Sequence, residues 1–257
     1  MKIKVSELTR RYGDFVAVDH ISFEVDRGEV LGYLGPNGAG KSTTVKMLTG
    51  ILQPTSGRIL IDGQDLRDHT LSIKQRIGYV PEIGGLYESL TGMGFLQLVG
   101  RLYHLEEDAI THKAQEFFRL FGLEKSLDQR LSSYSKGMKQ KVLISSALIH
   151  NPEIVFLDEP LSGLDANTML VFKELIRELA AQGKTIFYCS HILDVVERVC
   201  LRVIIIDRGK IVADAPVSEL KQSTKQGSLE DVFKKLTDST EVNEIAKSFS
   251  AVVAGSQ

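Results

Sequence analysis

The most constraining feature of the sequence is the glycine-rich segment at residues 35–42, which directly follows an apolar run at residues 30–34. It fits the pattern G-x-x-x-x-G-K-[ST], in which backbone N–H groups and the positive end of the next helix surround a phosphate. Lys41 can then reach the terminal phosphates, and the Ser42 hydroxyl can bind Mg²⁺. The pattern predicts a nucleotide-binding loop between a strand and a helix; a glycine turn before an ordinary helix is the alternative. The loop residues expected to contact the nucleotide are Gly35, Pro36, Asn37, Gly38, Ala39, Gly40, Lys41, Ser42 and Thr43.

Hydrophobic alternation predicts that the first part of the chain is a mostly antiparallel lead-in sheet. Its strands are expected at residues 3–8, 15–25 and 30–34, with a further strand at 58–61. The dipeptide Asp62-Gly63 ends that further strand and indicates a tight hairpin. A helix is expected at 41–48, after the phosphate loop.

From about residue 91 to residue 150 the apolar spacing becomes helical, which predicts an inserted helical subdomain. One helix face is expected to carry Phe95, Leu98, Val99 and Leu102, and another Ala114, Phe117, Phe118 and Phe121. Strand patterns resume at 154–157, 185–188, 203–206 and 210–213, with a helix at 166–181 between the first two. This alternation implies a parallel sheet with crossover helices. The expected fold class is α/β: a P-loop NTPase core with a mainly parallel sheet, an N-terminal antiparallel β subdomain and the helical insertion.

The composition limits the size and the partners of the protein. Its 257 residues, 43% of them hydrophobic, suffice for one large α/β domain with a modest insertion. The net charge of -2 gives no broad basic field, so nucleic acid is not expected as a partner. Cys189 and Cys200 form no C-x-x-C motif and are expected to be buried structural thiols in a reducing cytosol. No segment approaches the ~20 apolar residues that cross a bilayer, so any membrane role is expected to require a partner.

The predicted strand at 154–157 ends in two acids, Asp158 and Glu159. Taken alone, it could be a strand that ends in solvated carboxylates. Beside a phosphate loop, however, an acid at the carboxyl end of a parallel strand lies where ligands bind. Asp158 is then positioned to hold Mg²⁺, and Glu159 to orient and deprotonate an attacking water.

Together with further motifs, these residues make the chain resemble the ATP-binding subunits of ABC transporters, from residue 1 to about 236. Tyr12 looks like the aromatic residue that stacks on adenine in that family. Ser135 and Gly137 match the family signature, commonest as L-S-G-G-Q, whereas Tyr134, Lys136 and Met138 depart from it. A serine hydroxyl and N–H groups at a helix start can bind a γ-phosphate. The resemblance implies that this helix faces ATP held by the opposite subunit of a head-to-tail dimer.

Three other residues match motifs of the family. Asp165 ends a D-loop, Ser162-Gly163-Leu164-Asp165, which resembles a loop at the dimer boundary; it can also cap the following helix. His191 resembles the switch histidine that contacts the γ-phosphate and helps to hold the attacking water. Glu82 stands where the family has a glutamine, and its carboxylate could reach Mg²⁺ or water. It adds a negative charge, and the following residues 83–87 are expected to line a groove for a helix of a membrane partner.

The resemblance implies an ATPase that uses ATP and Mg²⁺ and drives transport. Its expected partners are a second ATP-binding subunit, identical or paralogous, and an integral membrane permease. It is expected to be peripheral, at the cytoplasmic face of the cell membrane. Residues 1–236 are expected to form the ATP-binding domain, with the insertion at about 91–150 and a partly mobile tail at 237–257.

The signature variant at 135–141 and the segment at 228–233 resemble ATPases of ABC-2 type exporters more than importers. Two alternatives remain open. One is a soluble ABC ATPase that acts on ribosomes or in DNA repair; the other is a P-loop kinase that phosphorylates a small molecule.

Overall fold

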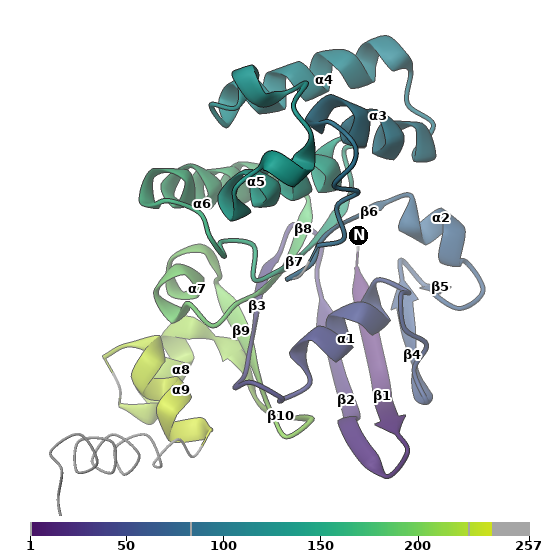
Figure 1. Cartoon of the computed structure of the whole chain (residues 1–257). Coiled ribbons are helices and arrows are strands. Elements are labelled where there is room, and N and C mark those ends of the chain that lie inside the picture. Colours follow the sequence, from purple (N-terminus) through teal and green to yellow (C-terminus); the bar gives the residue numbers. More distant parts are fainter. Residues whose placement is uncertain (1, 83, 226, 238–257) are drawn as a thin grey trace, which may run out of the picture.

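The computed structural model describes residues 2–82, 84–225 and 227–237. Two β-sheets lie side by side, and most of the helices stand above or beside the larger sheet (Figure 1). The predicted tail at 237–257 lies, apart from Thr237, outside the described residues. In the described part of the chain, no helix is both long enough and apolar enough to span a membrane.

The larger sheet has six strands in the order β10-β9-β3-β8-β7-β6. Every neighbouring pair from β9 to β6 is parallel, and β10 pairs antiparallel with β9 at one edge. The expected parallel sheet is therefore confirmed. The strands are β3 (Val30–Leu34), β6 (Ile77–Val80), β7 (Ile154–Asp158), β8 (Thr185–Cys189), β9 (Arg202–Asp207) and β10 (Lys210–Pro216).

The smaller sheet is antiparallel, in the order β2-β1-β4-β5. Its strands are β1 (Ile3–Tyr12), β2 (Phe15–Val25), β4 (Ser56–Ile61) and β5 (Gln64–Asp65). Asp62 and Gly63 both have positive φ angles, of 50° and 78°, as a tight hairpin turn requires. The expectation that β3 belongs to this sheet is wrong, because β3 pairs with β8 and β9. The apolar residues of β3 pack into hydrophobic clusters on both faces of the sheet, as is typical of a parallel strand buried on two sides.

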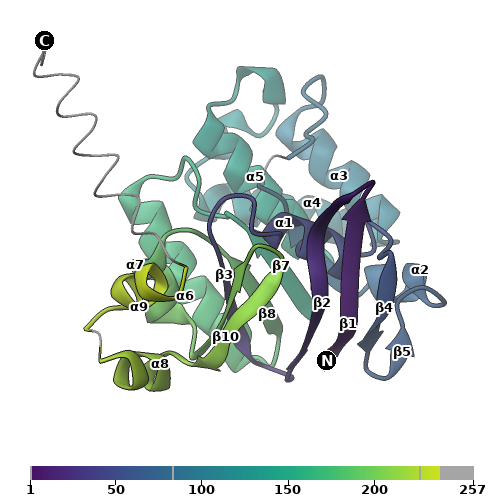
Figure 2. The ribbon, with the colours of Figure 1, turned by 90° about the horizontal axis from the view of Figure 1, so that it is seen from below.

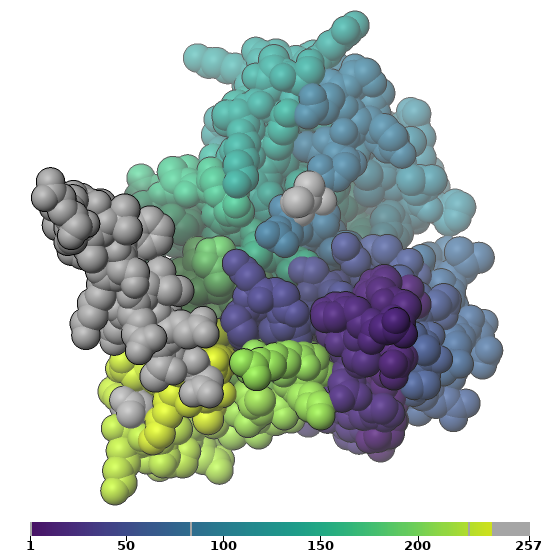
Figure 3. Space-filling model, turned by 60° about the horizontal axis from the view of Figure 1, so that its bottom comes forward, coloured from purple at the N-terminus to yellow at the C-terminus, as the bar shows by residue number. Residues whose placement is uncertain are grey.

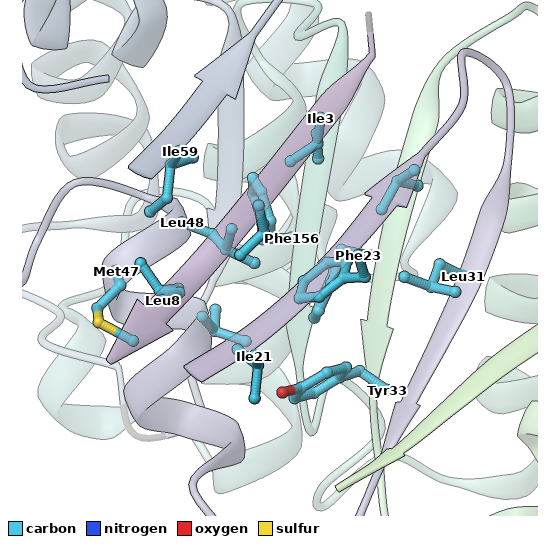
Figure 4. Packing of buried hydrophobic residues seen from close by; sticks show 14 of the residues in the cluster. Ile3, Leu8, Ile21, Phe23, Leu31, Tyr33, Met47, Leu48, Ile59 and Phe156 are labelled. Atoms are coloured by element: carbon cyan, nitrogen blue, oxygen red, sulfur yellow. The ribbon is translucent and has the colours of Figure 1, made fainter. Parts of the chain in front are cut away.

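Helix α1 (Lys41–Leu48) packs between the two sheets. Figure 4 shows Met47 and Leu48 of this helix beside Leu8 and Ile59 of the small sheet, with Phe156 of β7 behind them. Since all five side chains are almost fully buried, this cluster fixes α1 against both sheets. The phosphate loop, which leads directly into α1, is thereby held in place.

The range expected to be helical holds α3 (Gly92–Leu102), α4 (Glu107–Leu120) and α5 (Lys136–Leu148), with two short 3₁₀ turns at Glu124–Ser126 and Leu131–Ser133. These helices form the upper part of the molecule in Figure 1 and share a separate apolar cluster. Leu102, which was expected on one helix face with Phe95, is 69% exposed, whereas Phe95 is buried. A Cβ on Gly100 would lie 2.6 Å from Ile110, so α3 meets α4 at Gly100, and Leu102 lies about 200° further round the helix.

The remaining helices are α2 (Thr70–Lys74), α6 (Ala166–Ala181), α7 (Leu193–Val199), α8 (Val217–Thr224) and α9 (Leu229–Leu236). Only α6 was expected from the sequence. Seen from below, α7, α8 and α9 lie on the side of the large sheet away from β1 and β2 (Figure 2). In the space-filling view, the N-terminal strands and the C-terminal helices flank the light-green β9–β10 hairpin (Figure 3). Cys189 and Cys200 are buried and unpaired, as expected.

Candidate active site

A cavity of about 540 Å³ opens where the carboxyl ends of β3, β7 and β8 meet. Ligands bind at this edge in open α/β sheets. The lining residues are Tyr12, Phe15, Ala17, Asn37, Gly38, Gly40, Lys41, Ser42, Thr43, Glu82, Asp158, Glu159 and His191. All of them except Phe15 and Ala17 were predicted from the sequence as site residues. Among the other predicted loop residues, Ala39 is buried in the core, and Gly35 and Pro36 line a neighbouring cavity of about 220 Å³.

The phosphate loop is packed too closely against the protein to carry side chains at two of its glycines. A Cβ on Gly35 would lie 2.4 Å from the carbonyl oxygen of Ile206. Gly40 has a φ of 104°, and a Cβ there would lie 2.4 Å from the carbonyl oxygen of Ala17. The glycines thus allow the backbone to curl around the cavity, which is the shape a phosphate chain requires.

Lys41 is the first residue of α1, and its ammonium group lies inside this loop. The Nζ atom donates hydrogen bonds to the carbonyl oxygens of Gly35, at 2.7 Å, and Pro36, at 3.0 Å. The first N–H groups of any helix lack partners within the helix, and here they lie beside that positive charge. The arrangement fits a polyphosphate.

Asp158 ends β7 beneath the cavity and is 2% exposed. Burial raises the pKa of its carboxyl above the ordinary value, and the nearby charge of Glu82 raises it further. Hydrogen bonds from Ser42 and Cys189 oppose this rise. A buried carboxylate whose ionisation is resisted in this way is stabilised by a cation.

The described residues contain no group of three or more His, Cys, Asp or Glu side chains that could hold a metal ion by themselves. Mg²⁺ does not need such a group, because it binds through one or two protein ligands together with substrate phosphates and water. Ser42, Asp158 and Glu82 all line this cavity. These residues fit a Mg²⁺ ion shared with a nucleotide.

Glu159 and His191 form a close pair at the edge of the cavity. The Nδ1 atom of His191 lies 2.8 Å from Oε1 of Glu159, which also accepts a hydrogen bond of 2.9 Å from the backbone N–H of His191. The Glu159 side chain is 10% exposed, whereas that of His191 is 70% exposed. Glu159 has a φ of 50°, which is unusual for a residue with a side chain. The structure therefore holds a carboxylate in a fixed orientation beside an accessible imidazole.

Two aromatic residues at the β1–β2 hairpin form the outer wall of the cavity. Tyr12 and Phe15 lie opposite each other in the register of β1 and β2. Tyr12 is 46% exposed and Phe15 is 63% exposed. The guanidinium of Arg10 stacks on the Tyr12 ring at 4.6 Å. Exposed aromatic rings at a polar cavity suit the face of a base. Phe15 was missed in the sequence, although its position across a two-residue turn from Tyr12 could have indicated it.

Ser135, Gly137 and Asp165 do not line the cavity. Ser135 and Gly137 lie at the start of α5, and Asp165 lies just before α6. Ser135 caps α5 by accepting a hydrogen bond from the N–H of Met138 at 3.3 Å, and Asp165 caps α6 through the N–H of Thr168 at 2.9 Å. A Cβ on Gly137 would lie 2.6 Å from the carbonyl oxygen of Gly163, so α5 and the loop before α6 are in contact. Both predicted caps are confirmed. Within one chain, however, neither helix start reaches the cavity.

Replacing Glu82 with glutamine should lower the pKa of Asp158, because it removes a neighbouring negative charge. When folding raises the pKa of a carboxyl, the protonated group stabilises the folded state. This contribution to the free energy of unfolding is complete below the pKa of the unfolded chain, and it is lost as the pH rises through the higher pKa of the folded protein. Without Mg²⁺, Glu82→Gln should therefore lose less stability than the wild type as the pH rises above about 4. Thermal unfolding midpoints measured at increasing pH from about 4 test the effect. The exposed Glu124, replaced in the same way, is the control and should leave the pH dependence unchanged.

Comparisons with known proteins agree with this geometry. The family described as "ABC transporter" matches residues 18–162. The chain is 37% identical over 238 residues to the ABC transporter ATP-binding protein NatA of Bacillus subtilis (strain 168), an alignment that covers 90% of this chain and 96% of that protein. It is 36% identical over 225 residues to the bacitracin transport ATP-binding protein BcrA of Bacillus licheniformis, with 87% of this chain and 72% of that protein covered.

Solved structures share the fold. A structure described as the ATP-binding subunit of an ABC transporter superposes with a TM-score of 0.86 and 34% identity, covering 92% of this chain and 99% of that one. The dimeric structure of a post-hydrolysis state of an ATP-binding cassette bound to ADP and Pi superposes with a TM-score of 0.75 and 25% identity, covering 83% of this chain and 98% of that one.

Proposed function

Because the chain belongs to the ABC transporter family and is an ATP-binding, ATP-hydrolysing subunit, we propose that it powers a separate integral membrane permease that acts as an exporter. The observation that supports this proposal most directly is that the phosphate loop, with Lys41 inside it, lines the same cavity as the paired Glu159 and His191. The exporter branch is supported by the signature variant, by the segment at 228–233 and by the relative named for bacitracin transport.

We assign the steps of hydrolysis to residues around the cavity. Tyr12 would stack on adenine, while the loop N–H groups and Lys41 would hold the phosphates. Glu159 would orient the attacking water and accept its proton, and His191 would contact the γ-phosphate. Mg²⁺, bound by Ser42 and Asp158 with Glu82 close by, would neutralise charge on the phosphates.

A second ATP-binding subunit would complete the site. Ser135, Gly137 and Asp165 do not line the cavity of their own chain, although a helix start with a serine cap suits a γ-phosphate. In a head-to-tail pair these residues would close the cavity of the opposite subunit. The dimeric state of the similar ADP-bound and Pi-bound cassette supports this arrangement. ATP binding would bring the subunits together, and hydrolysis would release them.

Ser135→Arg should block ATP-dependent dimerisation. The long cationic side chain replaces a small exposed cap at the proposed dimer boundary, and it also removes the hydrogen bond to Met138. Sedimentation with ATP under conditions that prevent hydrolysis measures the outcome. Ser218→Arg, which makes the same change at an exposed position on α8, should still dimerise. A Ser135→Arg protein that dimerises like the wild type contradicts the shared site.

The contact with the permease would lie next to the cavity. Glu82 lines the cavity, and a few residues later Tyr87 is 63% exposed while its ring packs against Phe95 of α3. We propose that residues 84–87 contribute to a groove that receives a helix of the permease; Ile83 of the predicted groove lies outside the described residues. Motion of α3 during closure would then reach the permease through this segment.

Recovery of the protein from native membranes tests the proposal as a whole. A co-purified integral membrane protein with several spans, together with release of free phosphate from ATP, is the expected result. Co-purification with ribosomes would favour the soluble ATPase, and a phosphorylated small molecule would favour the kinase. The proposal further places the ATP-binding domain at residues 1–236, with its insertion at about 91–150, at the cytoplasmic face of the membrane.

A further inference from the structure

The end of strand β8 lies directly against the two acids of the site. Asp158 pairs with Cys189 across the β7–β8 ladder, and the N–H of Glu159 donates a 2.9 Å hydrogen bond to the carbonyl oxygen of Cys189. This register places Ser190 beside the Glu159 side chain. The two residues are 31 positions apart in the sequence, so only the pairing of the strands brings them together.

Ser190 is 1% exposed, and both of its hydrogen-bonding functions are used. Its hydroxyl oxygen accepts a hydrogen bond from the N–H of Ile192 at 3.1 Å and donates to Oε2 of Glu159 at 3.1 Å. A serine hydroxyl has a single proton to donate. Because the bond from Ile192 orients the oxygen, that proton points at the Glu159 carboxylate.

The two oxygens of Glu159 therefore have different partners. Oε1 lies on the side of the exposed imidazole and accepts from the N–H of His191, whereas Oε2 is held from the interior by Ser190. Two fixed donors on two oxygens prevent the carboxylate from rotating about its last bond. Without Ser190, only one side of the group would be held.

We propose that Ser190 is a positioning residue for ATP hydrolysis: its buried hydroxyl fixes the rotation of the Glu159 carboxylate, so that Oε1 faces the attacking water. The inference rests on the proposed role of Glu159 as the general base. Ser190 keeps its proton throughout, and it does not line the cavity that would hold the nucleotide. Its effect belongs to the hydrolysis step rather than to the binding of ATP.

Ser190→Ala should lower kcat about 10- to 100-fold, the scale seen when the support of a functional group is removed. The KM for ATP should stay within about twofold, because no contact with the nucleotide is lost. Ser190→Thr keeps the hydroxyl and should restore most of the activity. The control is Ser145→Ala, which deletes an equally buried hydroxyl that bonds only within α5 and should leave kcat unchanged.

A double mutant of Ser190 and Glu159 distinguishes a positioning role of Ser190 from a general loss of structure. In the Glu159→Gln background, Ser190→Ala should cause almost no further loss of kcat. If Ser190→Ala lowers kcat in the Glu159→Gln background as much as it does in the wild type, the inference is overturned. A Ser190→Ala protein with the kcat of the wild type also overturns it. Both outcomes leave Glu159 as the base. If Glu159→Gln itself retains full turnover, the base assignment fails and this inference fails with it. Should Ser190→Ala not fold, Ser190→Cys fills the same space with a weaker donor, and full activity of that variant also overturns the inference.

Discussion

Glu159→Gln is expected to bind ATP normally and to turn it over about 10² to 10⁴ times more slowly, the usual effect of losing a general base. Glutamine has the same shape, and its carbonyl oxygen can accept the hydrogen bond from the N–H of His191 that now reaches Oε1. The fold of the loop and the cavity is therefore kept. Only the ability to accept a proton from water is removed. Phosphate release at saturating ATP measures the turnover, and nucleotide titration measures the binding.

The matched control is Glu153→Gln, at the opposite end of the same strand. Glu153 directly precedes β7 and forms a partly exposed ion pair with Arg76, so its loss removes the same charge without affecting the cavity. Its turnover should equal that of the wild type. With hydrolysis blocked, the Glu159→Gln protein should also remain dimeric in ATP. An unchanged turnover number for Glu159→Gln would remove this residue from the chemistry and leave the base unassigned.

Local sequence signals predicted the helices around the site well. Both α1 and α6 begin and end where expected, because the residues before them mark their starts: Gly40 allows the positive φ before α1, and Asp165 supplies a side-chain cap to α6. The same reasoning placed Ser135 at the start of α5. Each of these signals depends on residues three or four positions apart, so the start of a helix can be predicted from the local sequence alone.

It was harder to predict which sheet each strand belongs to, because the alternation of apolar and polar residues along a strand does not indicate which strands pair with it. The strand at Val30–Leu34 follows two antiparallel strands in sequence, yet it lies between β8 and β9, which are more than 150 positions further along the chain. The parallel partners of β3 depend on crossover connections that no short pattern contains. The short helices α7, α8 and α9 have few residues in which a helical period can appear, and they were missed for that reason.

The same limit explains which site residues were missed. Asp158, Glu159 and His191 belong to recognisable motifs, whereas Cys189 and Ser190 gain their meaning only from the register of β8 against β7. A serine before a histidine carries no signal by itself. Its importance appears once its hydroxyl is seen to reach a carboxylate from a distant part of the chain.

Lys41→Ala is expected to weaken ATP binding about 10- to 100-fold, since hydrogen bonds to charged groups contribute roughly 1.5 to 3 kcal/mol and 1.4 kcal/mol is tenfold in affinity. The lysine acts in two ways. Its charge lies inside the loop that faces the phosphates, and its Nζ atom ties together the carbonyl oxygens of Gly35 and Pro36 at the start of that loop. Alanine removes both the cation and the link. Titration with ATP and Mg²⁺, followed by calorimetry, measures the loss.

Lys46→Ala distinguishes this local effect from a change in overall charge. Lys46 lies one turn further along α1 and is exposed, so its removal changes the net charge by the same amount without opening the loop. Its affinity for ATP should match that of the wild type. Because α1 is packed between the two sheets through Val45, Met47 and Leu48, neither lysine is needed to hold the helix in place, and both variants should unfold at similar temperatures. If Lys41→Ala bound ATP as tightly as Lys46→Ala, the loop would bind phosphate through its backbone N–H groups alone, and the assigned role of Lys41 would have to be withdrawn.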